Sequence, residues 1–308
     1  MERAAPDLIT ILGPTATGKT ALGAALAAAL DSEMISADSR QVYRGMDIGT
    51  GKDYGDYLVG GRRVVCHLID IVEPGTEYNL YAYQRDFLRA YEAIRARNAI
   101  PILCGGSGLY LQAVLKGYRM AAVPPNPELR RELASRSDEE LARQLAGLVR
   151  MHNVTDTASR ERLERAVEIA LYSRDHPDEP AFPRISSICF GIHFERDEIR
   201  ERISRRLEAR LAEGLVDEVA GLLKNGVSVA TLKYYGLEYR CVVSYLVGEL
   251  SWEAMKGGLN TAIHQFAKRQ MTWFRKMERE GIVISWLDGH MSTEEKVREI
   301  LARLPVRP

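Results

Sequence analysis

The chain has 308 residues, with 42 basic and 42 acidic side chains and a formal net charge of zero. This length suits one large domain or two ordinary ones, and the charge balance excludes a polyelectrolyte surface over the whole molecule while allowing a local basic face. No apolar run approaches the roughly 20 residues of a membrane span, and Leu8–Leu12 is too short for a signal peptide. With four widely spaced cysteines, the chain is expected to be a cytoplasmic protein without a disulfide or a zinc site.

The chain opens with a predicted strand, a glycine-rich loop and a helix. The strand is Leu8–Leu12, the loop reads G-P-T-A-T-G-K-T over Gly13–Thr20, and the helix is expected near 19–30. This is the pattern of a phosphate-binding loop (P-loop) in the context that the motif requires. Its backbone N–H groups form a nest for phosphate oxygens, Lys19 adds a positive charge, and the Thr20 hydroxyl can hold Mg²⁺. The loop predicts a bound di- or triphosphate but does not identify the molecule that carries it.

Strand and helix patterns continue to alternate up to about residue 120. Further strands are expected at Met34–Ala37, Val64–Val72 and Ile100–Cys104, with helices near 79–97 and 107–115. Such alternation predicts an α/β fold: a P-loop NTPase-like core in which a parallel sheet has helices on both faces. The P-loop and the ends of the other strands then meet at the carboxyl edge of the sheet, where ligands bind.

Two proline-rich breaks, at 124–127 and 176–183, enclose a charged segment with a helical pattern. We expect residues 124–183 to form a small helical insertion domain, and residues 1–123 with 184–308 to form the core and its C-terminal helices. Ser187–His193 is interpreted as a strand that returns to the sheet.

From residue 197 onward the pattern is mostly helical. Apolar residues at i, i+4 spacing from Ile199 to Leu211 mark a buried stripe, and a row of arginines runs beside it. Solvated ion pairs with neighbouring glutamates are the alternative interpretation of these arginines. The row consists of Arg202, Arg206 and Arg210.

A second amphipathic helix is predicted over Ile263–Arg279. On a helical wheel, its apolar and basic residues fall on opposite sides. We expect the apolar side to pack on the domain and the basic side to face a polyanion. The alternative interpretation is a plain amphipathic surface helix. The apolar side holds Ile263, Phe266, Trp273, Phe274 and Met277, and the basic side holds Lys268, Arg269, Arg275, Lys276 and Arg279.

Further strings follow the P-loop in a fixed order: D-S-R-Q-V-Y at 38–43, D-I-G-T-G-K at 47–52, H-L-I-D at 67–70, G-G-S-G-L-Y at 105–110, and A-K-R-Q with T-W-F-R within 267–275. Together with the P-loop, this set resembles the tRNA dimethylallyltransferase family (tRNA isopentenyltransferases) over nearly the whole chain. The resemblance implies transfer of a dimethylallyl group from dimethylallyl diphosphate to N6 of adenosine-37, next to the tRNA anticodon, with release of diphosphate.

The resemblance further implies that the P-loop holds the diphosphate of the prenyl donor. Negative charge builds on this leaving group as the allylic C–O bond breaks, and Lys19 with Mg²⁺ on Thr20 would stabilise it. The expected donor-binding residues are Gly13, Thr15, Ala16, Thr17, Gly18, Lys19, Thr20 and Arg202.

Asp38 matches the family's general base, a carboxylate at a strand end that takes a proton from the adenine amine. A helix cap, or a partner of metal-bound water, is the alternative role for Asp38. Ser107 stands where the family usually has threonine, so a hydroxyl near the reacting groups is kept. The adenine would have to be flipped out of the anticodon loop into a closed channel that excludes water.

The resemblance implies that tRNA contacts come from the segment after the base, from the insertion and from the C-terminal helix. The partner would be the tRNA anticodon stem-loop, and we expect a monomer. The matching residues are Asp38, Ser39, Arg40, Gln41, Arg130, Arg162, Arg165, Lys268, Arg269, Gln270, Trp273 and Arg275.

Some positions depart from the family's strings. Gly51 replaces a commoner alanine, Gly236-Leu237-Glu238 matches only in part, Ile263-His264 stands where most relatives have Thr-Arg, and the tRNA set is left open. Three rival functions stay open: an adenylate isopentenyltransferase that acts on free AMP or ATP, a P-loop kinase, and an RNA-binding protein with an inactive P-loop. The insertion and the basic helix disfavour the first, the absence of an apolar run ending in Asp-Glu disfavours the second, and an intact Lys19 disfavours the third.

Overall fold

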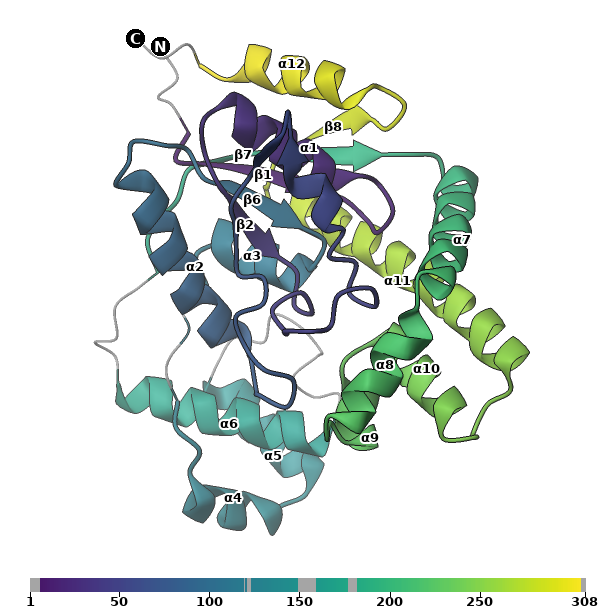
Figure 1. Ribbon diagram of the computed structural model, residues 1–308. Coiled ribbons are helices and arrows are strands. Elements are labelled where there is room, and N and C mark those ends of the chain that lie inside the picture. The colour runs from purple at the N-terminus through teal and green to yellow at the C-terminus, as the bar shows by residue number, and fades with distance from the viewer. Residues whose placement is uncertain (1–5, 119, 121–122, 149–158, 177–181, 306–308) are drawn as a thin grey trace. The chain divides into compact units, whose positions relative to one another are not determined.

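The structure is a computed structural model that describes residues 6–118, 120, 123–148, 159–176 and 182–305. The chain divides into two compact units (Figure 1): a larger unit formed by Met1–Gly117 with Arg184–Pro308, and a smaller unit, Tyr118–Pro183. The smaller unit begins before the proline break at which the insertion was expected to begin.

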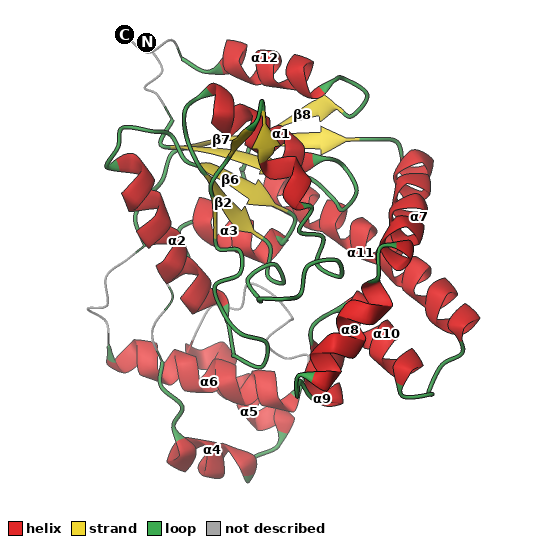
Figure 2. Cartoon of the chain, in the orientation of Figure 1, coloured by secondary structure: helices red, strands yellow, loops and turns green. Residues whose placement is uncertain are grey.

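The larger unit is built on a six-stranded sheet in the order β5-β2-β6-β1-β7-β8, and every neighbouring pair is parallel (Figure 2). This confirms the predicted α/β fold. Three strands have the predicted bounds: β1 (Leu8–Leu12), β2 (Met34–Ala37) and β7 (Ser187–His193). β6 is Ile102–Gly105, and β1 is buried along its whole length, as expected for a central parallel strand.

Helices cover both faces of the sheet (Figure 2). Ile9 and Ile11 of β1 pack in one core with α1 (Lys19–Ala29) and α12 (Thr293–Arg303). Side chains alternate along a strand, so Leu8 and Leu12 point to the opposite face, where α3 and α11 lie. The remaining helices of this part are α2 (Leu80–Arg95), α3 (Gly108–Leu115) and α11 (Trp252–Arg279).

Two expectations about strands need correction. The predicted strand Val64–Val72 contains only the two-residue strand β5 (Cys66–His67), because Leu68 and Asp70 adopt positive φ values of 63° and 55° and turn the chain away from the sheet. The C-terminal part also contributes an edge strand, β8 (Ile284–Asp288), which was not predicted. A short 3-10 helix η1 (Tyr54–Tyr57) leads into a small hairpin of β3 (Leu58–Val59) and β4 (Arg62–Arg63).

The C-terminal helices form a second core within the larger unit. The buried apolar stripe of α7, including Ile203 and Leu207, packs there with Leu259 and Ile263 of α11. The elements are α7 (Arg196–Ala212), α8 (Leu215–Lys224), α9 (Val229–Tyr234), α10 (Leu237–Leu246) and α11.

The smaller unit is helical, with a leucine-rich core of its own that includes Leu133, Leu141 and Leu163. Its helices are α4 (Pro127–Ala134), α5 (Asp138–Leu148) and α6 (Arg160–Asp175). Among the described residues of both units, the helices are too short or too polar to cross a membrane.

Candidate functional site

The P-loop joins β1 to α1 at the carboxyl edge of the sheet. Ala16 and Gly18 have φ values of 64° and 78°, the left-handed geometry that lets successive N–H groups line a concave anion nest. Thr17 is buried, and its hydroxyl donates to the Pro14 carbonyl at 2.9 Å. Lys19 Nζ donates to the same carbonyl at 3.3 Å. The loop is therefore preformed, with its lysine held across it.

The Lys19 ammonium lies in a buried, electrostatically crowded position. Burial lowers its pKa below that of an ordinary lysine; the Cys104 thiol and the Asp38 carboxylate oppose this effect, whereas Arg206 and Arg210 add to it. An anion that binds beside this buried ammonium stabilises its charged form. These charges favour binding of a phosphate group.

Gln270 of α11 connects the P-loop to the loop after β6. Its Oε1 accepts from the Thr15 N–H at 2.9 Å, and its Nε2 donates to the Gly106 carbonyl at 2.9 Å. A Cβ on Gly106 would lie 2.4 Å from this Nε2, so a larger residue there would displace the Gln270 amide. Gln270 was predicted to contact tRNA, but its side chain is buried and supports the P-loop.

Trp273 lies one turn further along α11, against the same loop. Its Nε1 donates to Gln112 Oε1 at 2.9 Å, and a Cβ on Gly108 would approach its ring to 2.4 Å. Ile263, Phe274 and Met277 are buried as predicted. The prediction was wrong for Phe266, which is 38% exposed: the buried stripe runs through Ala267 and Gln270, and Phe266 stands at its edge.

Asp38 and Ser107 meet because they follow the adjacent strands β2 and β6. Asp38 Oδ1 accepts from the Arg40 N–H at 2.9 Å. Ser107 Oγ accepts from the Ser39 N–H at 3.1 Å, and the Ser107 N–H donates to the Ala37 carbonyl at 3.1 Å. The second carboxylate oxygen of Asp38 has no hydrogen bond to any residue that the structure describes. One carboxylate oxygen and one hydroxyl are thus positioned by backbone groups at the same edge of the sheet.

Arg40 and Gln41, which follow Asp38 in the sequence, lie in different surroundings. The buried Gln41 donates to the carbonyls of Thr50 at 3.4 Å and Gly51 at 3.1 Å, which places it inside the protein. Arg40 donates to the Tyr234 carbonyl at 3.3 Å, and its guanidinium lies 5.6 Å from the centre of the Tyr234 ring, which is 74% exposed. Arg40 is thus the member of this pair that lies partly exposed beside an exposed aromatic ring.

The arginine row of α7 forms a second side of the P-loop site. Arg202 Nε donates to the Ala16 carbonyl at 2.9 Å, and its guanidinium stacks 4.3 Å from the Phe194 ring. Arg206 donates to Thr15 Oγ1 at 3.4 Å and pairs with Asp53. Only Arg202 of the row was predicted to belong to the site. The i, i+4 spacing of the row was the signal that could have included Arg206.

The exposed face of α11 carries cations without counter-ions. Lys268, Arg269 and Arg275 are exposed and have no ion-pair partner in the described part of the chain. Lys276 differs, because it pairs with Glu280 at 3.7 Å and lies 5.2 Å from the Trp273 ring.

In the smaller unit, two of the predicted tRNA contacts pair with one acidic residue. Arg130 and Arg165 contact Glu168 at 3.1 and 2.5 Å, and Arg165 also donates to the Val123 carbonyl at 2.7 Å. Burial alone would raise the pKa of Glu168, but hydrogen bonds from Arg165, the Asn126 N–H and Arg130 hold it below its usual value. Arg162 lies exposed on α6.

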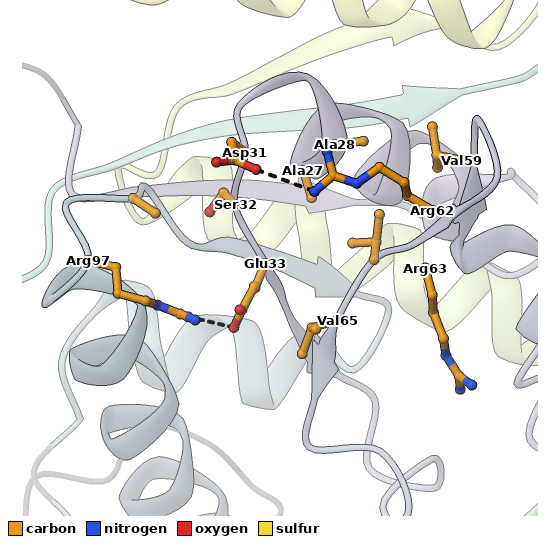
Figure 3. A pocket seen from close by; sticks show the side chains of 12 residues that line it. Ala27, Ala28, Asp31, Ser32, Glu33, Val59, Arg62, Arg63, Val65 and Arg97 are labelled. Carbon is orange, nitrogen blue, oxygen red and sulfur yellow. Dashed lines mark ion pairs between the residues drawn. The ribbon is translucent and has the colours of Figure 1, made fainter.

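A separate cleft of about 320 Å³ lies beside the C-terminal end of α1 (Figure 3). Glu33 pairs with Arg97 at 2.7 Å, and Asp31 with Arg62 at 3.9 Å, along its lining. Because α1 is 11 residues long, roughly 16 Å separate this cleft from the P-loop at the other end of the helix. The cleft therefore takes no part in the site described above.

Comparisons with known proteins agree on one family. The family model described as IPP transferase matches residues 41–277. A protein of Parabacteroides distasonis named tRNA dimethylallyltransferase 1 is 56% identical over 94% of this chain and 95% of its own length. One of Porphyromonas gingivalis strain W83, named tRNA dimethylallyltransferase 2, is 54% identical over 96% of this chain and 98% of its own length.

Solved structures give the same result. A tRNA isopentenylpyrophosphate transferase of Bacillus halodurans is 30% identical with a TM-score of 0.67, covering 95% of this chain and 93% of its own. The fold also matches a eukaryotic dimethylallyltransferase described as acting on tRNA, with a TM-score of 0.78 at 20% identity over 98% of this chain and 81% of the other.

Proposed function

Because the chain belongs to the IPP transferase family, we propose that it is a tRNA dimethylallyltransferase that transfers a dimethylallyl group from dimethylallyl diphosphate to N6 of adenosine-37 beside the anticodon. The observation that carries this proposal is the convergence of a preformed P-loop and an available Asp38 oxygen at one edge of the sheet. A phosphate nest beside a base suits the displacement of diphosphate by an amine.

The donor diphosphate binds in the P-loop nest. As the allylic C–O bond breaks, its electron pair passes to the diphosphate, and the N–H groups of the loop with Lys19 stabilise the charge that develops. Arg202 and Arg206 hold the opposite side of the loop through Ala16 and Thr15.

Mg²⁺ fits this site as a companion of the diphosphate. The described residues contain no cluster of three acidic, histidine or cysteine side chains that could hold a metal. Mg²⁺ commonly keeps several waters and takes few protein ligands besides substrate phosphates. The Thr20 hydroxyl, in the first turn of α1, would therefore be its protein ligand, and the ion would neutralise phosphate charge.

The acceptor amine attacks the allylic carbon, and Asp38 takes the proton that N6 loses. Asp38 Oδ1 is engaged by the Arg40 N–H, which leaves the second oxygen for the amine. The Ser107 hydroxyl accepts from the Ser39 N–H and donates to Ser39 Oγ at 3.5 Å, a long hydrogen bond that it can exchange for one to the acceptor base. Such a site needs an adenine that has left the anticodon-loop stack.

We assign the anticodon stem-loop to the exposed cations of α11, together with Ser39, Arg40 and Trp273 and with Arg162 of the insertion. Gln41, Gln270, Arg130 and Arg165 would act through the backbone and side-chain contacts that they make within the protein. A monomer in the cytoplasm, where tRNA is found, completes the proposal.

Mass spectrometry of tRNA nucleosides tests the reaction directly. Incubation with dimethylallyl diphosphate, Mg²⁺ and unmodified tRNA should yield N6-isopentenyladenosine at position 37. A parallel reaction offers AMP and an anticodon stem-loop in competition. Prenylated AMP without a modified stem-loop would instead identify an adenylate isopentenyltransferase, and phosphoryl transfer from ATP would identify a kinase.

The α11 face should set the salt dependence of tRNA binding. We expect the double variant Lys268→Ala/Arg275→Ala to bind tRNA more weakly and to reduce the slope of log K against log salt by about 0.7–0.9 for each phosphate that the protein no longer neutralises. Arg303→Ala is the control, because Arg303 lies on α12 and pairs with Glu299. Filter binding between 50 and 200 mM salt measures both slopes; an unchanged slope would place the RNA elsewhere.

A further inference from the structure

The third arginine of the α7 row, Arg210, is buried without a partner. Its side chain is 8% exposed, and its Nε is enclosed without a hydrogen bond. Within the described residues it also has no ion pair. A buried guanidinium without a hydrogen-bonded counter-ion costs free energy, because its hydration is lost and the charges of Glu238 and Asp53 act on it only from beyond ion-pair distance. An anion that binds beside the group offsets this cost.

A glycine makes room for Arg210. Gly51 has a φ of +70°, and a Cβ on it would lie 1.8 Å from Arg210 Nη2 and 2.8 Å from Arg206 Nη2. Two guanidinium groups thus meet at one point of the backbone, and Gln41 holds the Gly51 carbonyl in place. Positive charges gathered this closely repel one another, and Asp53 pairs with Arg206 but not with Arg210. An anion that binds beside Arg210 would relieve the remaining repulsion.

The position of Arg210 follows from the helix that carries it. The three arginines of the row stand one turn apart on α7, and the first two contact the P-loop at Ala16 and Thr15. The Arg210 charge acts on both Lys19 and Glu238. Burial raises the pKa of Glu238, and Asp38 raises it further while Arg210 opposes both. Arg210 therefore lies within electrostatic reach of the phosphate nest and of the carboxylates on the acceptor side.

We propose that Arg210, admitted by Gly51, is a further donor-binding residue that contacts the diphosphate from the side opposite the P-loop. This inference rests on the proposed function and adds a residue to its donor site. Gly51 is a position at which the chain departs from the family's usual strings, so the contact belongs to this chain and to those relatives that share the glycine and the arginine.

The variant Arg210→Met tests the proposal, because it keeps an unbranched stem and removes the guanidinium. We expect inorganic pyrophosphate to bind roughly tenfold to a hundredfold more weakly by calorimetry, as for the loss of a charged hydrogen bond. The KM for the donor should rise, tRNA affinity should not change, and the free protein should melt at a higher temperature because an unpaired buried charge is gone. An arginine with a merely structural role would lower the melting temperature.

Two further variants separate the guanidinium from the helix that carries it. Arg205→Met removes an exposed arginine of the same helix and should bind pyrophosphate like the unaltered protein. Gly51→Ala should weaken pyrophosphate binding by displacing Arg210, and the double variant Gly51→Ala/Arg210→Met should bind no more weakly than Arg210→Met alone, because both changes remove the same interaction.

Unaltered pyrophosphate affinity in Arg210→Met would overturn the proposal. If that variant instead lost tRNA affinity, Arg210 would hold a phosphate of the RNA and not of the donor. Failure of the proposed function is a different result, because it appears as an unaltered protein that binds pyrophosphate but does not modify tRNA.

Discussion

Replacing Asp38 by asparagine should lower the rate of prenyl transfer by about 10²- to 10⁴-fold, the usual contribution of a general base. Asparagine keeps a carbonyl oxygen for the Arg40 N–H, so the turn after β2 is retained while the proton acceptor is lost. Single-turnover experiments with saturating donor and tRNA measure the step directly. tRNA affinity should be unchanged, since neither the α11 face nor the fold is altered.

This substitution also separates a general base from a carboxylate that only caps the turn. A carboxylate that only caps the turn would be replaced well by asparagine, and the rate would be retained. Asp31→Asn is the matched control, because Asp31 is an exposed carboxylate before the other end of β2 and should not affect turnover. Full activity of Asp38→Asn would remove Asp38 as the base, and Asp38→Ala would then report on the turn alone.

The central strands could be predicted because each is marked by the residues within it and on either side of it. β1 is a continuous apolar run between turn residues, and β7 follows a proline-rich break, so both have the predicted bounds. β8 (Ile284–Asp288) was missed because it is an edge strand soon after a 28-residue helix. Gly281, with a φ of 91°, and the β-branched residues after it were the local signals that could have indicated it. The positive φ values that end β5, by contrast, depend on distant partners, since Asp70 pairs with Lys52.

The candidate site divides in the same way. The P-loop was predicted from its motif, and Asp38 and Ser107 were predicted from the family resemblance. The parallel strands that precede them bring all three to one edge of the sheet. The burial of Gln270 was not predicted, because a glutamine within a basic helical string looks like a surface residue until two glycine-containing loops are found against it. Arg210 is a similar case: its spacing on α7 was visible, but its loss of solvent depends on Gly51, far away in the sequence.

Lys19 should give the second large effect. Lys19→Met is expected to lower kcat/KM for the donor by about 10²- to 10³-fold, comparable to the loss of one donor that stabilises developing negative charge. Rapid-quench measurements with radiolabelled donor give this value, and tRNA affinity measured in parallel should be unaffected. A variant that loses tRNA affinity as well would indicate that the P-loop packing against Gln270 has been disturbed.

The pH dependence of donor binding should reflect the protonation of Lys19. The protonated ammonium of Lys19 is the form that binds diphosphate. Burial is the largest influence on the Lys19 pKa and lowers it. The ammonium of the free enzyme is therefore lost, as pH rises, at a pH below the ordinary lysine pKa of about 10.4. Pyrophosphate affinity should therefore fall at lower pH than an exposed lysine would give, and the difference between the unaltered protein and Lys19→Met should vanish at high pH. Calorimetry without RNA isolates the effect, and subtracting the Lys19→Met curve removes the titration of pyrophosphate itself.

The neighbouring Cys104 cannot produce this fall, because burial raises the pKa of its thiol to about 12. A difference between the two proteins that is constant with pH would mean that Lys19 keeps its charge throughout, with the P-loop and Asp38 outweighing its burial.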